Sequence, residues 1–220
     1  MLVQIYGITN AEDAAAVDRL GADHIGVVVD EGLATWDSVD ETTAATIIAS
    51  IARARVVGLS LSTDPDRIRQ TTKAVRPSIV HLARAHLMSD DALAAVREML
   101  SPIELMLTVP VVDDEALATA RRLQPAADYL LLDSKDPGTG IVGATGLVHD
   151  WRLSAAIVAT VEVPVILAGG LGPDNVTPAI DQVHPAGVDS ETHTSRTDDR
   201  RRKDLDKVDA FISLATRGAP

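Results

Sequence analysis

The chain has 220 residues, of which 46% are hydrophobic, and it carries a formal net charge of −12. This composition is typical of a folded protein, and we expect a single domain over residues 1–220, too acidic to bind nucleic-acid phosphates or an anionic membrane surface. The absence of cysteine excludes disulfides, thiolate nucleophiles and thiolate metal ligands.

Short β-branched runs alternate along the chain with longer, alanine-rich segments of helical period. The runs that predict strands are residues 2–8, 24–29, 56–61, 78–82, 104–111, 129–133, 163–168 and 185–189. The segments that predict helices lie near residues 11–20, 38–53, 64–75, 90–99, 113–122, 151–159, 173–182 and 203–215. Eight strands alternating with eight helices favour an α/β fold of the (β/α)8 TIM barrel type, with a doubly wound open sheet as the alternative.

The stretch LAGGLGPDNV, residues 167–176, ends a predicted strand with two glycines and then begins a helix. Gly169 and Gly170 allow the backbone to approach an anion closely, and the helix that begins at Pro173 adds N–H donors at its N-terminus. A phosphate site in a barrel lies between the loops after the seventh and eighth strands. The stretch therefore predicts a phosphate-binding loop, with a plain tight turn as the alternative.

The stretch LLLDS places Asp133 at the end of the sixth predicted strand. A carboxyl among apolar strand residues can have a raised pKa and serve as a general acid, although an aspartate there can also cap the next loop. That loop, residues 134–150, is the longest connection and is rich in glycine, which favours a functional lid.

Six stretches occur in the same order as in one enzyme family: QIYGITNAEDA, GADHIGVVV, YLLLDS, GATGLVHDW, LAGGLGPDNVTPAI and GVDSETHT with KDLDKVDAFI. In these stretches the chain resembles phosphoribosylanthranilate isomerase, a (β/α)8 barrel of tryptophan biosynthesis, over nearly its whole length. The resemblance implies an Amadori rearrangement of a phosphorylated sugar-amine, which is an aldose–ketose isomerisation. Such a reaction needs an acid to open the furanose ring and a base to take the C2 proton.

The resemblance assigns Asp133 as the general acid and the loop of Gly169 and Gly170 to the phosphate. The family's cysteine base falls on Tyr6, and the lysine of the same motif falls on Gln4, which becomes a candidate substrate contact.

Other family positions differ as well. The family's carboxylate-binding arginine falls on Thr35, and its histidine after the fourth strand falls on Ala83. The second phosphate loop reads Ser190-Glu191-Thr192-His193, so that Thr192 and His193 are candidate phosphate contacts and Glu191 brings a carboxylate to an anion site.

Tyr6 and His81 are the candidates for the second proton-transfer group. The reference pKa of a phenol is near 10, so Tyr6 is a poor base, and an acid, an oxyanion donor or an aromatic plug are its alternative roles. His81 shares a strand face with Ala83 and titrates near neutrality. The alternative for His81 is a hydrogen-bonded core histidine, paired with Gln4.

Three functions are consistent with these residues. The first is a divergent isomerase acting on a phosphorylated sugar or sugar-amine without a cofactor, with Asp133 as general acid. The second is a non-catalytic or repurposed barrel that binds a small anionic ligand. The third is a metal-assisted lyase or hydrolase in which Glu191 and His193, with Asp30 or Glu31, hold the metal.

We expect a small phosphorylated substrate, no nucleic-acid or membrane partner, and a monomer or homodimer. No apolar run approaches the roughly 20 residues of a bilayer span, and no secretory signal is recognisable, which favours the cytoplasm. The charge run at residues 196–204 is expected to be a solvated loop, with Arg196 as a remote candidate for an anion partner. Four histidines are expected at the surface or in loops: His24, His86, His149 and His184.

Overall fold

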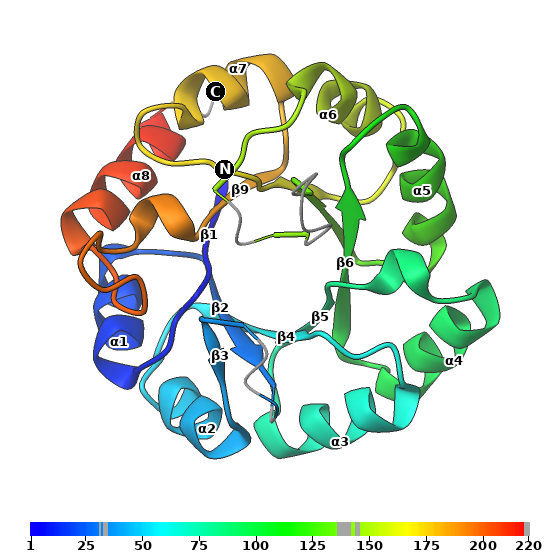
Figure 1. Cartoon of the computed structure of the whole chain (residues 1–220), viewed down its shortest axis with the longest axis horizontal. Helices are drawn as coiled ribbons and strands as arrows, with labels where there is room; N and C mark the ends of the chain where they lie inside the picture. The colour runs from blue at the N-terminus through cyan, green and yellow to red at the C-terminus, as the bar shows by residue number, and fades with distance from the viewer. Residues whose placement is uncertain (31, 33–34, 136–141, 144–145, 218–220) are drawn as a thin grey trace.

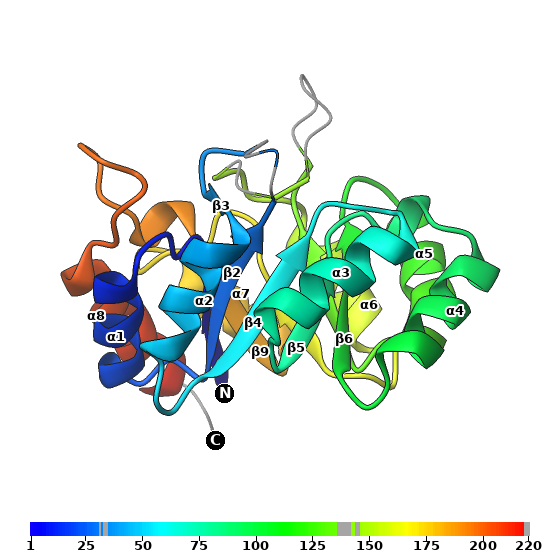
Figure 2. The same ribbon diagram turned by 90° about the horizontal axis from the view of Figure 1, so that it is seen from below.

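The computed structural model describes residues 1–30, 32, 35–135, 142–143 and 146–217. In this part of the chain a ring of helices surrounds a barrel of parallel strands (Figure 1). The carboxyl ends of the strands lie on one side of the barrel, and the N-terminus lies on the opposite side (Figure 2). No helix in the described ranges is long and apolar enough to cross a membrane.

The strands form one closed sheet. They are β1 (Leu2–Ile5), β2 (His24–Val29), β3 (Ser38–Val39), β4 (Arg55–Ser60), β5 (Ile79–Leu82), β6 (Glu104–Pro110), β7 (Tyr129–Asp133), β8 (Val165–Leu167) and β9 (Gly187–Ser190). The order is β1-β9-β8-β7-β6-β5-β4-β2, and β1 also pairs with β2, so the sheet has no open edge there. This closure confirms the predicted (β/α)8 barrel and excludes the alternative, a doubly wound open sheet. The two-residue β3 adds to the outer side of β2 and is not part of the ring.

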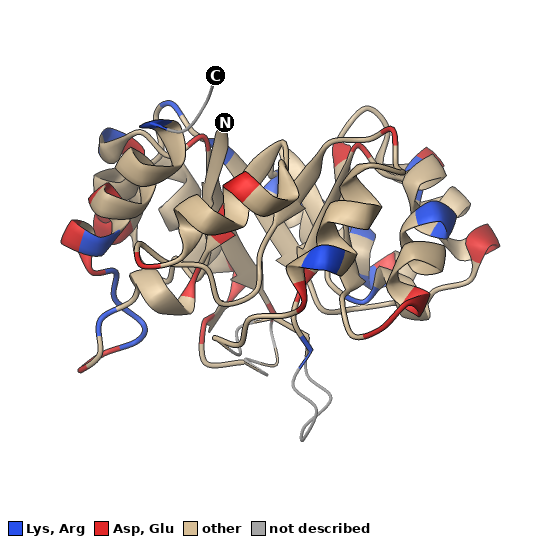
Figure 3. Cartoon of the chain, turned by 90° about the horizontal axis from the view of Figure 1, so that it is seen from above, with Lys and Arg blue, Asp and Glu red and all other residues tan. Residues whose placement is uncertain are grey.

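Within the described residues, eight α-helices cover the outside of the barrel. They are α1 (Ala11–Leu20), α2 (Glu41–Ala49), α3 (Pro65–Val75), α4 (Asp90–Leu100), α5 (Glu115–Leu123), α6 (Trp151–Val158), α7 (Val176–Val183) and α8 (Leu205–Arg217). Short 3₁₀ turns lie at η1 (Ala85–Leu87), η2 (Gln124–Ala126) and η3 (Thr192–Thr194). Charged residues of both signs lie mainly on these helices and on the surrounding loops (Figure 3).

Two predicted helix starts are wrong, for local reasons. Residues 38 and 39 pair with β2, and the Asp40 side chain then accepts the Thr43 N–H at 2.7 Å, so α2 begins at residue 41 rather than 38. The segment from Pro173 is not yet helical, because the Asn175 side chain holds the turn by accepting from Gly172 N at 2.9 Å and donating to Gly170 O at 2.9 Å. Helix α7 therefore begins at residue 176.

The interior of the barrel is filled by inward-facing side chains. Those that form the inner apolar cluster are Tyr6, Val28, Val57, Ile79, Met106, Leu131, Ile166 and Ala168. A larger apolar cluster lies between the strands and the helices. The Tyr6 ring lies directly against the backbone of Gly26, where a Cβ atom would overlap it. The glycine on β2 is thus what gives the aromatic ring its space.

Candidate active site

A small hollow opens at the carboxyl ends of β7, β8 and β9. It is lined by Asp133, Gly146, Gly169, Gly170, Leu171, Asp189, Glu191, Thr192 and His193. The structure therefore brings together six of the residues that the sequence singles out: Asp133, Gly169, Gly170, Glu191, Thr192 and His193. Tyr6, His81 and Gln4 are not among the residues that line the hollow.

The glycine loop after β8 has the backbone shape that glycine alone adopts without strain. Gly169 has φ +79° and Gly170 has φ +64°. A Cβ atom at Gly170 would lie 2.7 Å from the carbonyl carbon of Leu147, so the loop also packs tightly against the segment that follows β7. The loop is therefore a tight turn, and its binding of a phosphate stays a prediction.

Asp133 ends β7 with its carboxyl enclosed by backbone. Its Oδ1 accepts the Ser134 N–H at 2.7 Å, and a Cβ atom at Gly143 would lie 2.8 Å from its Oδ2. Burial raises the pKa of Asp133 to about 7, against the opposing effect of the Ser134 hydrogen bond. An acid with this pKa can hold a proton near neutral pH and deliver it to a substrate.

Tyr6, His81 and Thr108 form a buried hydrogen-bonded chain. The Tyr6 hydroxyl lies 2.6 Å from His81 Nδ1, and His81 Nε2 lies 2.6 Å from the Thr108 hydroxyl. Burial lowers the pKa of His81 to about 3, so the imidazole is neutral. Burial, and then the negative charge of Asp189, raises the pKa of Tyr6 well above its ordinary value. The phenol therefore donates to Nδ1, and neither group is poised to accept a substrate proton.

Gln4 lies deeper in the barrel, completely buried, and pairs with neighbouring strands rather than with His81. Its Nε2 donates to Asp189 Oδ1 at 3.2 Å, and its Oε1 lies 3.2 Å from His24 Nδ1. His24 is 2% exposed, which corrects the expectation of a surface residue. Burial, followed by the charge of Asp133, raises the pKa of Asp189 to about 8.

Glu191 and His193 do not converge as metal ligands. His193 points its Nε2 at Gly146 O, 3.2 Å away, whereas the Glu191 carboxyl lies over Gly7, where a Cβ atom would be 2.7 Å from Oε1. Asp30 Oδ1 accepts the Gly32 N–H at 3.0 Å. Glu31 lies outside the described residues, and among those that are described no three His, Asp or Glu side chains are placed to hold a metal ion.

The other residues that the sequence analysis considered, Thr35, Ala83 and Arg196, do not line the hollow. The Thr35 hydroxyl lies 2.5 Å from the Ser38 hydroxyl, Ala83 is buried, and Arg196 forms an ion pair with Asp198 at 2.8 Å rather than reaching the hollow. Much of the predicted lid falls on residues 136–141 and 144–145, outside the described residues.

Sequence reasoning missed three buried ionisable residues near the hollow: Asp37, Asp189 and Lys203. Of these, Asp189 carries a detectable signal, because strand alternation places it on the same inward face as Glu191. Asp37 and Lys203 lie in irregular segments, where no periodicity marks an inward side chain.

Comparisons with known proteins agree over the whole length. A family model described as N-(5'phosphoribosyl)anthranilate (PRA) isomerase matches residues 3–213. The N-(5'-phosphoribosyl)anthranilate isomerase of Haloferax volcanii is 37% identical, over 99% of this chain and 95% of the relative. The protein of the same name from Methanocella arvoryzae is 33% identical, over 96% of this chain and 95% of the relative.

Solved structures agree as well. The phosphoribosyl anthranilate isomerase of Thermotoga maritima superposes with a TM-score of 0.84 at 26% identity, over 99% of each chain. A phosphoribosyl anthranilate isomerase in complex with reduced 1-(o-carboxyphenylamino)-1-deoxyribulose 5-phosphate superposes with a TM-score of 0.81 at 25% identity, over 99% of this chain and 100% of that one.

Proposed function

The chain belongs to the N-(5'phosphoribosyl)anthranilate isomerase family, and we propose that it isomerises a phosphorylated ribosylamine from the aldose to the ketose form. One observation carries the proposal: Asp133, a carboxyl whose pKa is raised to about 7 by burial, lines the same hollow as the Gly169–Gly170 loop. The ligand bound in the solved relative, reduced 1-(o-carboxyphenylamino)-1-deoxyribulose 5-phosphate, carries a phosphate of the kind that the glycine loop would hold.

Asp133 would open the sugar ring. Its proton goes to the ring oxygen, the C1–O bond breaks, and the nitrogen lone pair forms the C1=N bond of an iminium ion. A base then takes the C2 proton, the C2–H electrons form a C1=C2 bond, and the C1=N π electrons return to the nitrogen as its lone pair. Reprotonation at C1 and loss of the enol proton give the ketose, so no proton is gained or lost overall.

The phosphate would bind at the glycine loop. Gly169 and Gly170 present backbone at close range, and Thr192 and His193 stand on the facing side of the hollow. The enclosed carboxyls make the neighbourhood unfavourable for an anion unless they are protonated, so we expect phosphate affinity to fall as the pH rises above 7.

The test is turnover of phosphoribosylanthranilate by the purified protein, with the two isomers separated by chromatography. We expect turnover, and we expect Asp133→Asn to lower kcat by about 10²–10⁴-fold, the usual contribution of general acid–base catalysis. The exposed Asp209→Asn on α8, away from the hollow, serves as the matched control. Binding of a ketose phosphate analogue without any turnover would refute the isomerase and support a binding protein.

A further inference from the structure

The proposed reaction needs a proton acceptor that Tyr6 and His81 do not provide. Each is bonded within the buried chain that ends at Thr108, and neither lines the hollow. Besides Asp133, the ionisable residues that do line it are Asp189, Glu191 and His193. Asp189 accepts from Gln4 at the floor, and His193 is an exposed side chain bonded to Gly146 O. Glu191 is the group that remains.

The Glu191 carboxyl is well placed relative to the acid. Asp133 ends β7 and Glu191 directly follows β9, so β8 and its glycine loop stand between them. The carboxyl reaches across to the end of β1, against the backbone of Gly7. A sugar whose phosphate is held by the glycine loop would therefore have the Asp133 carboxyl on one side of that loop and the Glu191 carboxyl on the other.

A second carboxyl faces Glu191 from the loop after β2. Glu191 Oε1 and Asp37 Oδ1 are both buried without an N–H or O–H donor, and the two carboxyls are close enough to share one proton. Burial, and then the charge of Asp37, raises the pKa of Glu191 well above its ordinary value. Two like charges so close together repel each other, so this arrangement favours a proton that the two carboxyls share.

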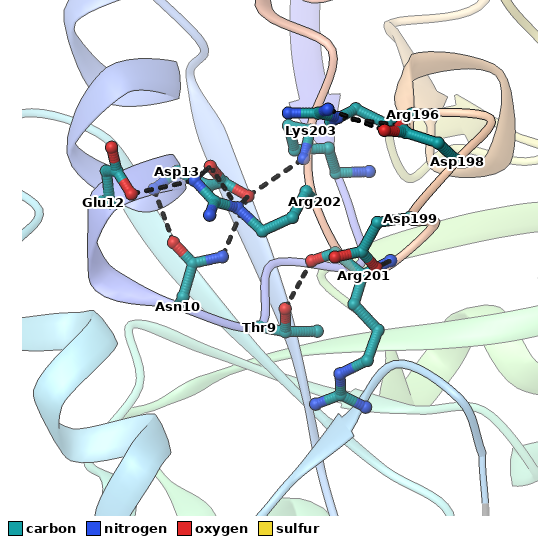
Figure 4. Close-up of polar contacts among 10 residues, drawn as sticks. All are labelled: Thr9, Asn10, Glu12, Asp13, Arg196, Asp198, Asp199, Arg201, Arg202 and Lys203. Carbon is teal, nitrogen blue, oxygen red and sulfur yellow. Dashed lines mark hydrogen bonds and ion pairs between the residues drawn. The ribbon is translucent and has the colours of Figure 1, made fainter.

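The loop between η3 and α8 fixes Asp37 in this place. Arg201 donates to the carbonyl oxygens of Trp36 and Ser38, the residues on either side of Asp37. The Arg201 carbonyl accepts from the Thr9 hydroxyl at 2.5 Å, which ties the same loop to the end of β1 (Figure 4). The loop is exposed over residues 196–201, as expected, and it also acts as a brace, because Arg201 ties it to the segments that follow β1 and β2.

The brace is anchored in turn to α1. Arg202 forms a two-pronged contact with the carboxyl of Asp13, at 3.0–3.2 Å, and an ion pair with Glu12 at 2.8 Å (Figure 4). Beside it, the buried Lys203 donates to Glu191 O at 2.9 Å and to the Ser195 hydroxyl at 3.1 Å. A cation next to the pair favours its singly charged form.

Resting on the proposed isomerase function, we propose that Glu191 is the base that takes the C2 proton, and that Asp37 is a positioning residue that shares the proton with it. The C2–H bond breaks, its electrons form C1=C2, the C1=N π electrons return to the nitrogen, and the proton is held on the Glu191 carboxyl until it is returned to C1.

The experiment measures kcat and KM for phosphoribosylanthranilate in four variants: Glu191→Gln, Glu191→Asp, Asp37→Asn and, as a matched control, the exposed Glu162→Gln. We expect Glu191→Gln to lower kcat by about 10²–10⁴-fold with KM changed less than about threefold, Glu191→Asp to keep part of the rate, and the control to match the wild type.

The pH profile separates a chemical role from a structural one. The titratable groups that face Glu191 are Asp37, Lys203, Asp189 and Tyr6. Removing the Asp37 charge stabilises the Glu191 carboxylate, so we expect Asp37→Asn to move the acidic limb of kcat/KM to lower pH while turnover persists.

The two levels of the proposal fail in different ways. Full activity of a folded Glu191→Gln protein, beside an inactive Asp133→Asn protein, would overturn the role of Glu191 and leave the isomerase standing. An unshifted pH profile in Asp37→Asn would overturn the shared proton. A wild-type protein that does not turn over the substrate would overturn the isomerase and the base together.

Discussion

Tyr6→Phe tests whether the Tyr6 hydroxyl stabilises the barrel interior or takes part in catalysis. The substitution removes the hydroxyl oxygen and leaves the aromatic ring. Tyr6 is 4% exposed and His81 is 2% exposed, and a hydrogen bond of 2.6 Å joins them. Because both side chains are buried, solvent does not replace this bond when it is lost. Removing the donor leaves Nδ1 of His81 buried and unpaired, which costs about 1–3 kcal/mol of unfolding free energy. For a chain of this size, each kcal/mol lowers Tm by about 2–4 °C.

The assay combines urea unfolding with isomerase kinetics. Tyr129→Phe is the matched control, because Tyr129 also lies inside the barrel but its hydroxyl accepts a longer bond, 3.3 Å, from the half-exposed Arg55. We expect Tyr6→Phe to lower the unfolding free energy by at least twice as much as Tyr129→Phe. We also expect kcat to change less than about threefold, because losing a proton-transfer group costs about 10²-fold or more.

The opposite pattern would refute this reasoning. A loss of kcat of about 10²-fold with unchanged stability would mean that the Tyr6 hydroxyl transfers a substrate proton. The buried chain to His81 would then be a proton relay rather than a support for the barrel interior.

Three further changes have outcomes that follow from the geometry. Gly26→Ala places a methyl group in the Tyr6 ring, and we expect a loss of about 1–3 kcal/mol in urea unfolding, relieved when the same protein also carries a smaller residue at position 6. Gly170→Ala forces a side chain to φ +64° against Leu147, and we expect calorimetry to show phosphate-analogue binding lost while the circular dichroism spectrum is retained. Because burial raises the pKa of Asp133 to about 7 and of Asp189 to about 8, the folded protein holds protons that the unfolded chain releases. The unfolding free energy should therefore fall from pH 7 to pH 8. This interval lies above the pH range in which the buried neutral histidines make the unfolding free energy rise with pH. A rise from pH 7 to pH 8 would contradict these assignments.

The alternation of strands and helices could be predicted because each element has its own hydrophobic period and its own residues that begin or end it. Local rules were insufficient where side chains or pairing intervene. Ser38 and Val39 read as the start of a helix, but they lie beside β2 and complete its outer edge. The signal for the true start was present, since Asp40 stands three residues before the N–H group that it caps, that of Thr43.

The candidate site was predictable only in the parts that one strand end or one loop determines. Asp133 and the two glycines are such cases, and the hollow contains all three. The partners of His81 were not predictable, because Tyr6 and Thr108 come from different strands and meet only through the register of the closed barrel. The same is true of Asp37 and Glu191, which the brace loop brings together.

The contact between Gly26 and Tyr6 also sets the order in which this barrel can change. A tyrosine at position 6 is tolerated only where position 26 already lacks a side chain, so the glycine is a precondition for it. The reverse step is hard, because replacing a buried aromatic ring by a small residue leaves a void that costs about 3–5 kcal/mol. Tyr6 and Gly26 therefore constrain each other: a smaller residue at position 6 costs stability, and so does a side chain at position 26 while the ring is in place.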